Sequence, residues 1–320
     1  MTEAIINGKA IYSTKGAARE YGRIGCNFYV GCPHGCTYCY LKRGAPSKQL
    51  GGSTATLKRC FRGEEHAMEV FRRDVDKHME QCRQQGVFFS FSTDPLIPET
   101  RGLTIAAARH CIEHDIPVWI LTKDASFAFD EDFRSLAADA RKMCRIRLLH
   151  AGFTLTWRSD LEPNASNNAD RVLAMHEIYG LGVQTFASIE PVIDWPSARI
   201  AIRYSRDVCQ HYMIGLRSGV KKDYYTPAKS VEAVRGILKD LSGYRCTIYF
   251  KESLRRHLAA VMTPDDYQAL LSHTVDQDGT PSWSEAFADT QRSVRDAAST
   301  ARDLCDAAKR LREINLNQKK

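Results

Sequence analysis

Short apolar runs alternate with longer stretches of helical periodicity over the first 260 or so residues of the chain. Each apolar run is rich in Val, Ile, Phe, Tyr or Thr, which is typical of buried strands. The runs that predict strands cover residues 25–30, 87–92, 117–122, 149–156, 183–190, 211–216 and 246–250.

The stretches between these runs have the periodicity of amphipathic helices. One stretch, residues 64–82, places Ala67, Val70, Phe71 and Val75 on one face of a helix. Alternation of strands and helices predicts parallel strands joined by crossover helices. Six or seven such units are too few for a closed eight-strand barrel. We therefore predict an α/β fold, either an open, partial β/α barrel of about six strands or a doubly wound sheet, and favour the partial barrel.

The last part of the chain has a different pattern. Small and apolar residues recur there at steps of three and four, which predicts one long helix that ends at about residue 315. The predicted organisation is a barrel domain over residues 1–261 and a helical C-terminal extension over residues 262–320. The extension packs on the barrel or on a partner.

Charge is distributed unevenly between these two parts. Residues 262–320 hold 8 basic and 10 acidic side chains of the chain's 45 and 38, which leaves a net charge of +9 on residues 1–261. A basic surplus on the main body is compatible with a nucleic acid or another anionic partner. It is equally compatible with ordinary solubility charge, and the sequence leaves the oligomeric state open.

Cellular location follows from hydropathy and cysteine usage. No apolar stretch approaches the roughly 20 residues that span a membrane, and the N-terminus has no hydrophobic signal core. The chain has 11 cysteines, an odd number, which argues against a disulfide framework. We expect a cytoplasmic protein without a membrane partner.

Three of the cysteines form a compact triplet in the run GCPHGCTYCY. Cys32, Cys36 and Cys39 have the spacing C-x3-C-x2-C and directly follow the first predicted strand. Three thiolates can hold three irons of a four-iron cluster and leave the fourth iron open for a substrate or cofactor. Site loops of β/α folds lie at the C-terminal ends of strands, which is where the triplet falls.

Two other interpretations of the triplet compete with this one. A structural zinc ion needs a fourth ligand, and Cys26 or His34 could provide it. A closed four-cysteine cluster could also use Cys26. Zinc ribbons pair two cysteine knuckles separated by a dozen or more residues, and the sequence has no second knuckle. The rival functional hypothesis is a non-catalytic nucleic-acid-binding protein with a structural zinc or a closed cluster.

The triplet, with an aromatic residue before its last cysteine, resembles the radical S-adenosylmethionine superfamily. The stretch AREYGRIGCNFYVGCPHGCTYCYLKRG resembles more narrowly the branch of spore photoproduct lyase and DNA repair photolyase-like proteins. Four downstream segments support the resemblance in order: FSTDP, ILTK, FTLTWRSDLEPNASNNADR and FASIEPVID. The resemblance covers roughly residues 12–255.

The resemblance implies a set of site residues and cofactors. Cys32, Cys36 and Cys39 would bind a 4Fe-4S cluster, whose open iron would take the amino and carboxylate groups of S-adenosylmethionine (SAM). Tyr38 would lie near the adenine. Thr93 and Asp94 stand where the family places groups for the methionine ammonium, and Lys123 suits its carboxylate. The remaining implied contacts to ribose, sulfonium or substrate are Thr154, Ser188 and Glu190.

The activity implied is reductive cleavage of SAM to a 5′-deoxyadenosyl radical, which abstracts hydrogen from a substrate. A flavodoxin- or ferredoxin-like electron donor is the expected partner. Photoproduct lyases resemble one another in a cysteine on the second strand, where this chain has Phe91. The resemblance therefore implies lyase-like radical chemistry with the substrate, which could be related to nucleic acid, and the catalytic residues left open.

Overall fold

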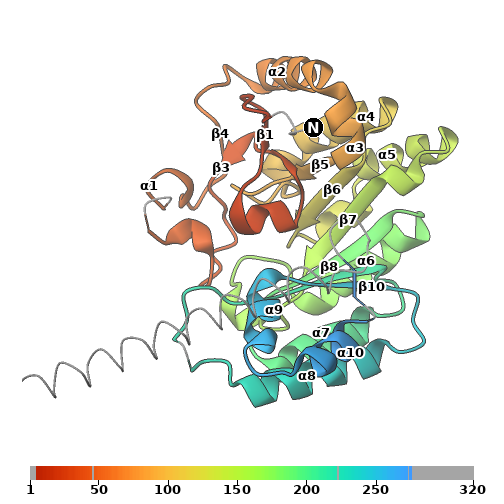
Figure 1. Ribbon diagram of the computed structural model, residues 1–320. Coiled ribbons are helices and arrows are strands. Elements are labelled where there is room, and N and C mark those ends of the chain that lie inside the picture. The colour runs from red at the N-terminus through yellow and green to blue at the C-terminus, as the bar shows by residue number, and fades with distance from the viewer. Residues whose placement is uncertain (1–4, 45–46, 222, 273, 276–320) are drawn as a thin grey trace, which may run out of the picture.

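The computed structural model describes residues 5–44, 47–221, 223–272 and 274–275 (Figure 1). Its main feature is one curved sheet with the strand order β1-β2-β5-β6-β7-β8-β9-β10. Strand β1 pairs antiparallel with β2, and all other neighbours are parallel. The strands are β1 (Ile11–Ser13), β2 (Ile24–Cys26), β5 (Val87–Phe89), β6 (Val118–Thr122), β7 (Leu149–Thr154), β8 (Gln184–Val192), β9 (His211–Leu216) and β10 (Thr247–Phe250).

Helices connect the strands and lie along one side of the sheet (Figure 1). They are α2 (Glu64–Lys77), α3 (Met79–Gln85), α4 (Pro98–Glu113), α5 (Glu131–Lys142), α6 (Asn168–Gly180), α7 (Trp195–Ser205), α8 (Pro227–Leu241), α9 (Glu252–Ala259) and α10 (Pro264–Leu271). Side chains cap several of them. The carboxylate of Asp130, for example, accepts hydrogen bonds from the amides of Asp132 and Phe133 at the start of α5, which satisfies N–H groups that have no partner within the helix.

Several short elements complete the fold. They are α1 (Ser47–Leu50), the two-stranded sheet of β3 (Tyr29–Val30) and β4 (Thr56–Leu57), and the 3-10 helices η1 (Gly16–Glu20), η2 (Tyr40–Lys42), η3 (Ser126–Phe129), η4 (Ile146–Leu148) and η5 (Ser159–Leu161).

The predicted α/β partial barrel is confirmed, with more strands than the six expected. Within the described residues β1 and β10 do not pair, so the barrel stays open. The predicted strand over residues 25–30 is two strands, because the chain turns at Asn27. The Asn27 side chain donates to the Tyr12 hydroxyl and accepts from the Phe91 amide. These bonds lie where the pairing of β2 with β5 ends and the chain continues into β3, which pairs with β4.

The C-terminal extension is only partly within the described residues. Helix α10 packs on the barrel, since Tyr267 and Leu271 are buried in the main core. Val275 donates its amide to the carbonyl of Ile248 in β10. The long helix predicted to reach residue 315 lies outside the described residues, and the domain boundary at residue 261 stays a prediction.

None of the helices given above, which are those of the described residues, combines the length and the apolar character that a membrane span requires.

Candidate functional site

The three cysteines of the triplet border one open hollow of about 250 Å³. They lie in the loop that follows β3, and all three are free thiols. The segment after η2 forms the opposite wall. The residues that line the hollow are Cys32, His34, Gly35, Cys36, Cys39, Leu41, Lys42, Leu50, Gly51 and Gly52. The structure therefore brings together the three residues that the sequence predicted as iron ligands.

Close backbone packing holds the cysteine loop in place. Gly31 has a φ of +82°, and a Cβ there would lie 2.3 Å from the carbonyl oxygen of Thr54. Only glycine fits this combination of a left-handed conformation and a near backbone contact. On the other side of the loop, the amide of Thr37 donates to the carbonyl of Leu161. The connection from β7 to α6 thus supports the loop from beneath.

The buried carboxylate of Asp94 ties the cysteine loop to the end of β6. It accepts four hydrogen bonds, from His34 Nε2 at 2.8 Å, Thr122 Oγ1 at 2.6 Å, and the amides of Lys123 and Leu96 at 2.7 and 3.0 Å. Burial alone would raise the pKa of Asp94, but its donors, above all His34, hold it down to about 2. Asp94 is therefore a charged link between two loops.

Thr93 has a similar structural contact, because its hydroxyl donates to the carbonyl of Gly31. The hydroxyl proton of Thr93 and the carboxylate oxygens of Asp94 are thus engaged within the protein. Their implied role as direct contacts of the methionine ammonium stays a prediction.

A second group of buried charges lies under the loop. Glu162 Oε2 is 2.7 Å from Arg171 Nη2, and both side chains are fully buried. The Tyr38 hydroxyl donates to the other oxygen of Glu162, and Arg171 Nη1 donates to the carbonyl of Thr154 at 2.8 Å. Thr154 is buried at the end of β7, so this group connects the cysteine loop to the end of that strand.

Lys123 provides a cation next to the cysteines. Its ammonium lies 5.8 Å from the centre of the Tyr38 ring. Burial lowers the pKa of Lys123, but the nearby Cys36 and Glu162 outweigh burial and raise it. The side chain therefore carries a positive charge at neutral pH, as the predicted contact with a carboxylate requires.

The thiols of Cys32 and Cys36 are held in their protonated form. Burial raises the pKa of Cys32 to about 11, with the charge of Asp94 adding to the effect, and burial also raises the pKa of Cys36. A metal ion must displace these protons when it binds, since the thiolate is the ligand. Three thiols on one hollow suit an iron–sulfur cluster or another thiophilic metal.

The two residues considered as a fourth ligand are engaged elsewhere. Cys26 is fully buried in the apolar core, on β2. His34 borders the hollow, but its Nε2 bonds the Asp94 carboxylate and its Nδ1 bonds the carbonyl of Asn164 at 3.2 Å. Both partners are acceptors, so both ring nitrogens carry protons. Although burial lowers the pKa of His34, its contacts with Asp94 raise it overall.

The other two predicted residues, Ser188 and Glu190 on β8, belong to a separate polar cluster. The Tyr21 hydroxyl lies 2.7 Å from Ser188 Oγ and donates to Glu190 Oε2 at 2.5 Å. The ammonium of Lys251 lies 2.5 Å from the same Glu190 oxygen and 4.0 Å from the centre of the Tyr21 ring. The segment around η1 thus reaches across the barrel to β8 and β10.

Sequence reasoning missed several residues that build the site. Glu162, Arg171 and Asn164 all fall in the segment FTLTWRSDLEPNASNNADR, which was noted only as a whole. Lys251 follows the last predicted strand directly, and that position was a usable indication of a buried charge at a strand end. The position of Tyr21 in the sequence gave no comparable indication that it belongs to a polar cluster.

Comparison with solved structures finds the same fold in spore photoproduct lyase. A variant of that enzyme gives a TM-score of 0.54 at 13% identity, over 75% of this chain and 78% of the lyase. The lyase complexed with dinucleoside spore photoproduct gives 0.52 at 12% identity, over 77% and 80%. The resemblance expected from the sequence is therefore confirmed at the level of the fold.

A further variant of the lyase, with bound S-adenosylmethionine and dinucleoside spore photoproduct, gives a TM-score of 0.47 at 14% identity. That alignment covers 73% of this chain and 64% of the lyase, which is less than two thirds of its length. No protein-family model and no curated protein sequence matches the chain.

Proposed function

We propose that this protein is a radical S-adenosylmethionine enzyme, with Cys32, Cys36 and Cys39 as the ligands of a 4Fe-4S cluster. The observation that carries the proposal is the convergence of these three free thiols on one hollow, where the described residues leave no fourth ligand available. The cysteine loop comes after β2, the first strand of the open β/α barrel that has a parallel neighbour, and after the short β3. The chain shares this fold with spore photoproduct lyase.

Different residues of the chain would bind the carboxylate and the adenine of SAM and hold the cysteine loop. When bound, the cluster supplies an electron that cleaves SAM reductively and makes a carbon radical available for hydrogen abstraction. Lys123 holds a positive charge beside the cysteines and pairs with the methionine carboxylate. Tyr38, fixed by its bond to Glu162, offers a ring face to the adenine. Asp94 and His34 keep the loop in position.

We propose that the substrate lies at the second polar cluster, the one around Glu190. Ser188, Glu190 and Tyr21 lie on the inner part of the open barrel, together with the stacked rings of Phe88 and Phe91, whose centres are 4.7 Å apart. Phe91 provides no hydrogen atom of the kind a cysteine donates, so we do not propose photoproduct repair. The basic surplus on residues 1–261 is compatible with an anionic, nucleic-acid-related substrate.

Anaerobic reconstitution with iron and sulfide tests the proposal. After reduction with dithionite and addition of SAM, we expect the electron paramagnetic resonance signal of a four-iron cluster and formation of 5′-deoxyadenosine. Cys36→Ala should abolish both. Cys26→Ala is the matched control, since Cys26 is buried in the core, and it should retain the signal.

Other outcomes of this experiment would contradict the proposal or favour its alternative. Absence of both the signal and 5′-deoxyadenosine from the wild-type chain would overturn the proposal. About one zinc per chain that Cys36→Ala removes, with no iron bound after reconstitution, would favour the non-catalytic, zinc-containing alternative. DNA binding that weakens steeply with added salt would support the nucleic-acid-related substrate class.

A further inference from the structure

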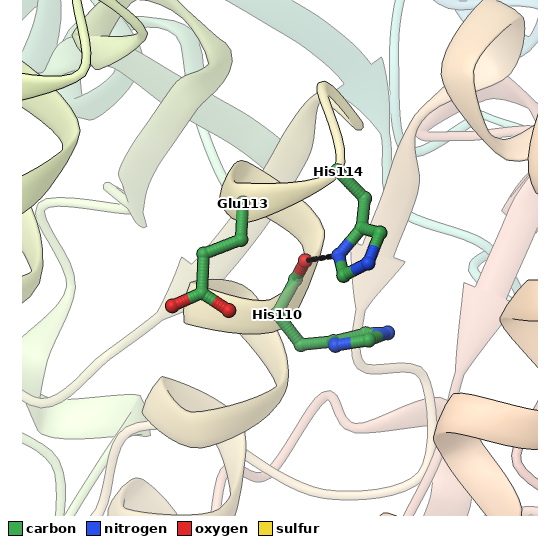
Figure 2. Close-up of side chains that lie close together, drawn as sticks. All are labelled: His110, Glu113 and His114. Carbon is green, nitrogen blue, oxygen red and sulfur yellow. Dashed lines mark hydrogen bonds between the residues drawn. The ribbon is translucent and has the colours of Figure 1, made fainter.

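The last turn of α4 gathers three potential metal ligands. Among the described residues, His110, Glu113 and His114 each offer one ligand atom, and these atoms lie within 4.8 Å of one another. Figure 2 shows the two imidazole rings projecting from one side of the helix and, in this view, the Glu113 carboxylate on the other side of the same turn. No other group of this kind occurs in the part of the chain that the structure describes.

The spacing of these residues suits metal chelation. Positions i, i+3 and i+4 of an α-helix lie on adjacent parts of one face. Two histidines at i and i+4 hold zinc in well-known helical sites. Zinc bonds of roughly 2.0–2.1 Å place tetrahedral ligands about 3.4 Å apart. The ligand atoms, which lie within 4.8 Å of one another, therefore exceed that separation by at most about 1.4 Å.

A hydrogen bond fixes the ring of His114, and a ring nitrogen of His110 is left without a partner among the described residues. His114 Nδ1 donates to the carbonyl of His110 at 2.8 Å, as Figure 2 shows, so the lone pair of its Nε2 is directed outward. Metal-binding histidines commonly donate their second ring nitrogen to a carbonyl in this way, because the bond fixes the ring. His110 Nε2 is buried and has no hydrogen-bond partner among the described residues.

The charges around the site are mixed. Burial lowers the pKa of His110, and the nearby His114 and Arg72 lower it further, while Asp76 and Glu113 oppose them. Arg83 and Arg145 also approach the turn, but their side chains donate to the backbone carbonyls of His114 and Glu113. The Glu113 carboxylate has no ion-pair partner within the described residues.

We propose that the C-terminal turn of α4 binds one divalent transition metal ion of the zinc class through His110, Glu113 and His114, with water completing the coordination. The helix runs from the end of β5 to the start of β6, so its last turn lies at the opposite end of the barrel from the cysteine loop. The ion stabilises this end of α4, because it binds the folded chain.

Cobalt(II) is the probe that tests this site, since it replaces zinc and reports its ligands by colour. The full chain is freed of loosely bound metal by a chelator, its cysteines are loaded with the cluster, and cobalt is added anaerobically. We expect one cobalt per chain with visible bands and no sulfur-to-cobalt charge transfer. His114→Ala should weaken this binding at least about tenfold. His176→Ala removes an exposed histidine of α6 and should leave it unchanged.

Two further measurements keep the test decisive. Circular dichroism establishes that His114→Ala is folded, and Glu113→Gln, which keeps the shape of the side chain, should also weaken binding. Unchanged cobalt affinity in both variants, or cobalt bands that carry sulfur charge transfer alone, would overturn the site. If the cluster cannot be loaded, the cysteines reveal themselves by that charge transfer, so this outcome is distinct from failure of the proposed function.

Discussion

The carboxylate of Glu162 and the guanidinium of Arg171 lie 2.7 Å apart beneath the cysteine loop, and neither side chain is exposed to solvent. Removal of one partner of a buried ion pair leaves an uncompensated charge. We expect Arg171→Met to lower the free energy of unfolding by about 3–5 kcal/mol.

Chemical denaturation followed by circular dichroism measures this effect. The double variant Glu162→Gln with Arg171→Met removes both charges and should recover most of the loss. An unfolding midpoint of Arg171→Met equal to that of the wild type would contradict the role assigned to the pair.

Asp94 gives a prediction about the cysteine loop. All four neighbours of its carboxylate are donors, so the amide of Asp94→Asn must direct an N–H group at another donor. We expect the free energy of unfolding to fall by roughly 3 kcal/mol, the upper end of the range for hydrogen bonds to charged groups. Hydrogen exchange at residues 32–39 should accelerate in the variant, because His34 loses its anchor.

The matched control is Asp160→Asn, at an exposed aspartate that pairs with Arg158 on the surface. Exposed pairs contribute roughly 0–1 kcal/mol, so this variant should behave like the wild type. Equal exchange rates in the loop of Asp94→Asn and Asp160→Asn would refute the anchoring role.

Lys251 is predicted to be essential for the cluster around Glu190. Its side chain is 1% exposed, and its ammonium lies 2.5 Å from Glu190 and 3.7 Å from Glu20. Lys251→Met leaves two carboxylates without their cation and should lower stability by roughly 3 kcal/mol or more. Thermal and denaturant unfolding measure the loss, and Lys239→Met, at an exposed lysine of α8, is the control. Equal stability of the two variants would show that Lys251 is dispensable.

His150 makes stability depend on pH. Burial lowers the pKa of His150 to about 4, although Nδ1 donates to the carbonyl of Val118. Below about pH 6.5 the unfolded chain binds a proton that the folded chain does not, so stability falls as pH decreases toward 4. His150 alone should lower the free energy of unfolding by about 2 kcal/mol between about pH 7 and pH 5.

His150→Asn keeps a donor for Val118 but cannot be protonated in this range. Denaturant unfolding of the variant should therefore show a shallower decline with decreasing pH than the wild type does. His176→Asn, at an exposed position of α6, serves as the control and should follow the wild-type curve. A parallel decline in His150→Asn would assign the pH dependence to other groups.

Much of the fold was predictable because apolar runs directly report buried parallel strands. The predicted strand at 211–216 coincides with β9, and that at 117–122 differs from β6 by one residue. The break between β2 and β3 was not predictable, because side-chain bonds of Asn27 to Tyr12 and Phe91 cause it. Such bonds join residues far apart in sequence and leave no periodic pattern.

The candidate site was predictable to a similar degree. The cysteine spacing is local, and the hollow that the three thiols share follows from it. Asp94 and Lys123 were recognisable as charges at strand ends. The bonds of Asp94 to His34 and Thr122 were not, and the contact with the methionine ammonium that the resemblance implies stays a prediction. The pairing of Glu162 with Arg171 depends on how two loops pack, which spacing alone does not encode.

The contacts of Glu20 with the far side of the barrel have a consequence for synthesis of the chain. Its carboxylate accepts from the Tyr249 hydroxyl and from the amide of Glu252, partners 229 and 232 positions away. Pairing over such separations is slow, and it cannot begin until residue 252 has left the ribosome. The N-terminal segment is made first, and its contacts with Tyr249 and Glu252 form only after nearly all of the described chain has been synthesised.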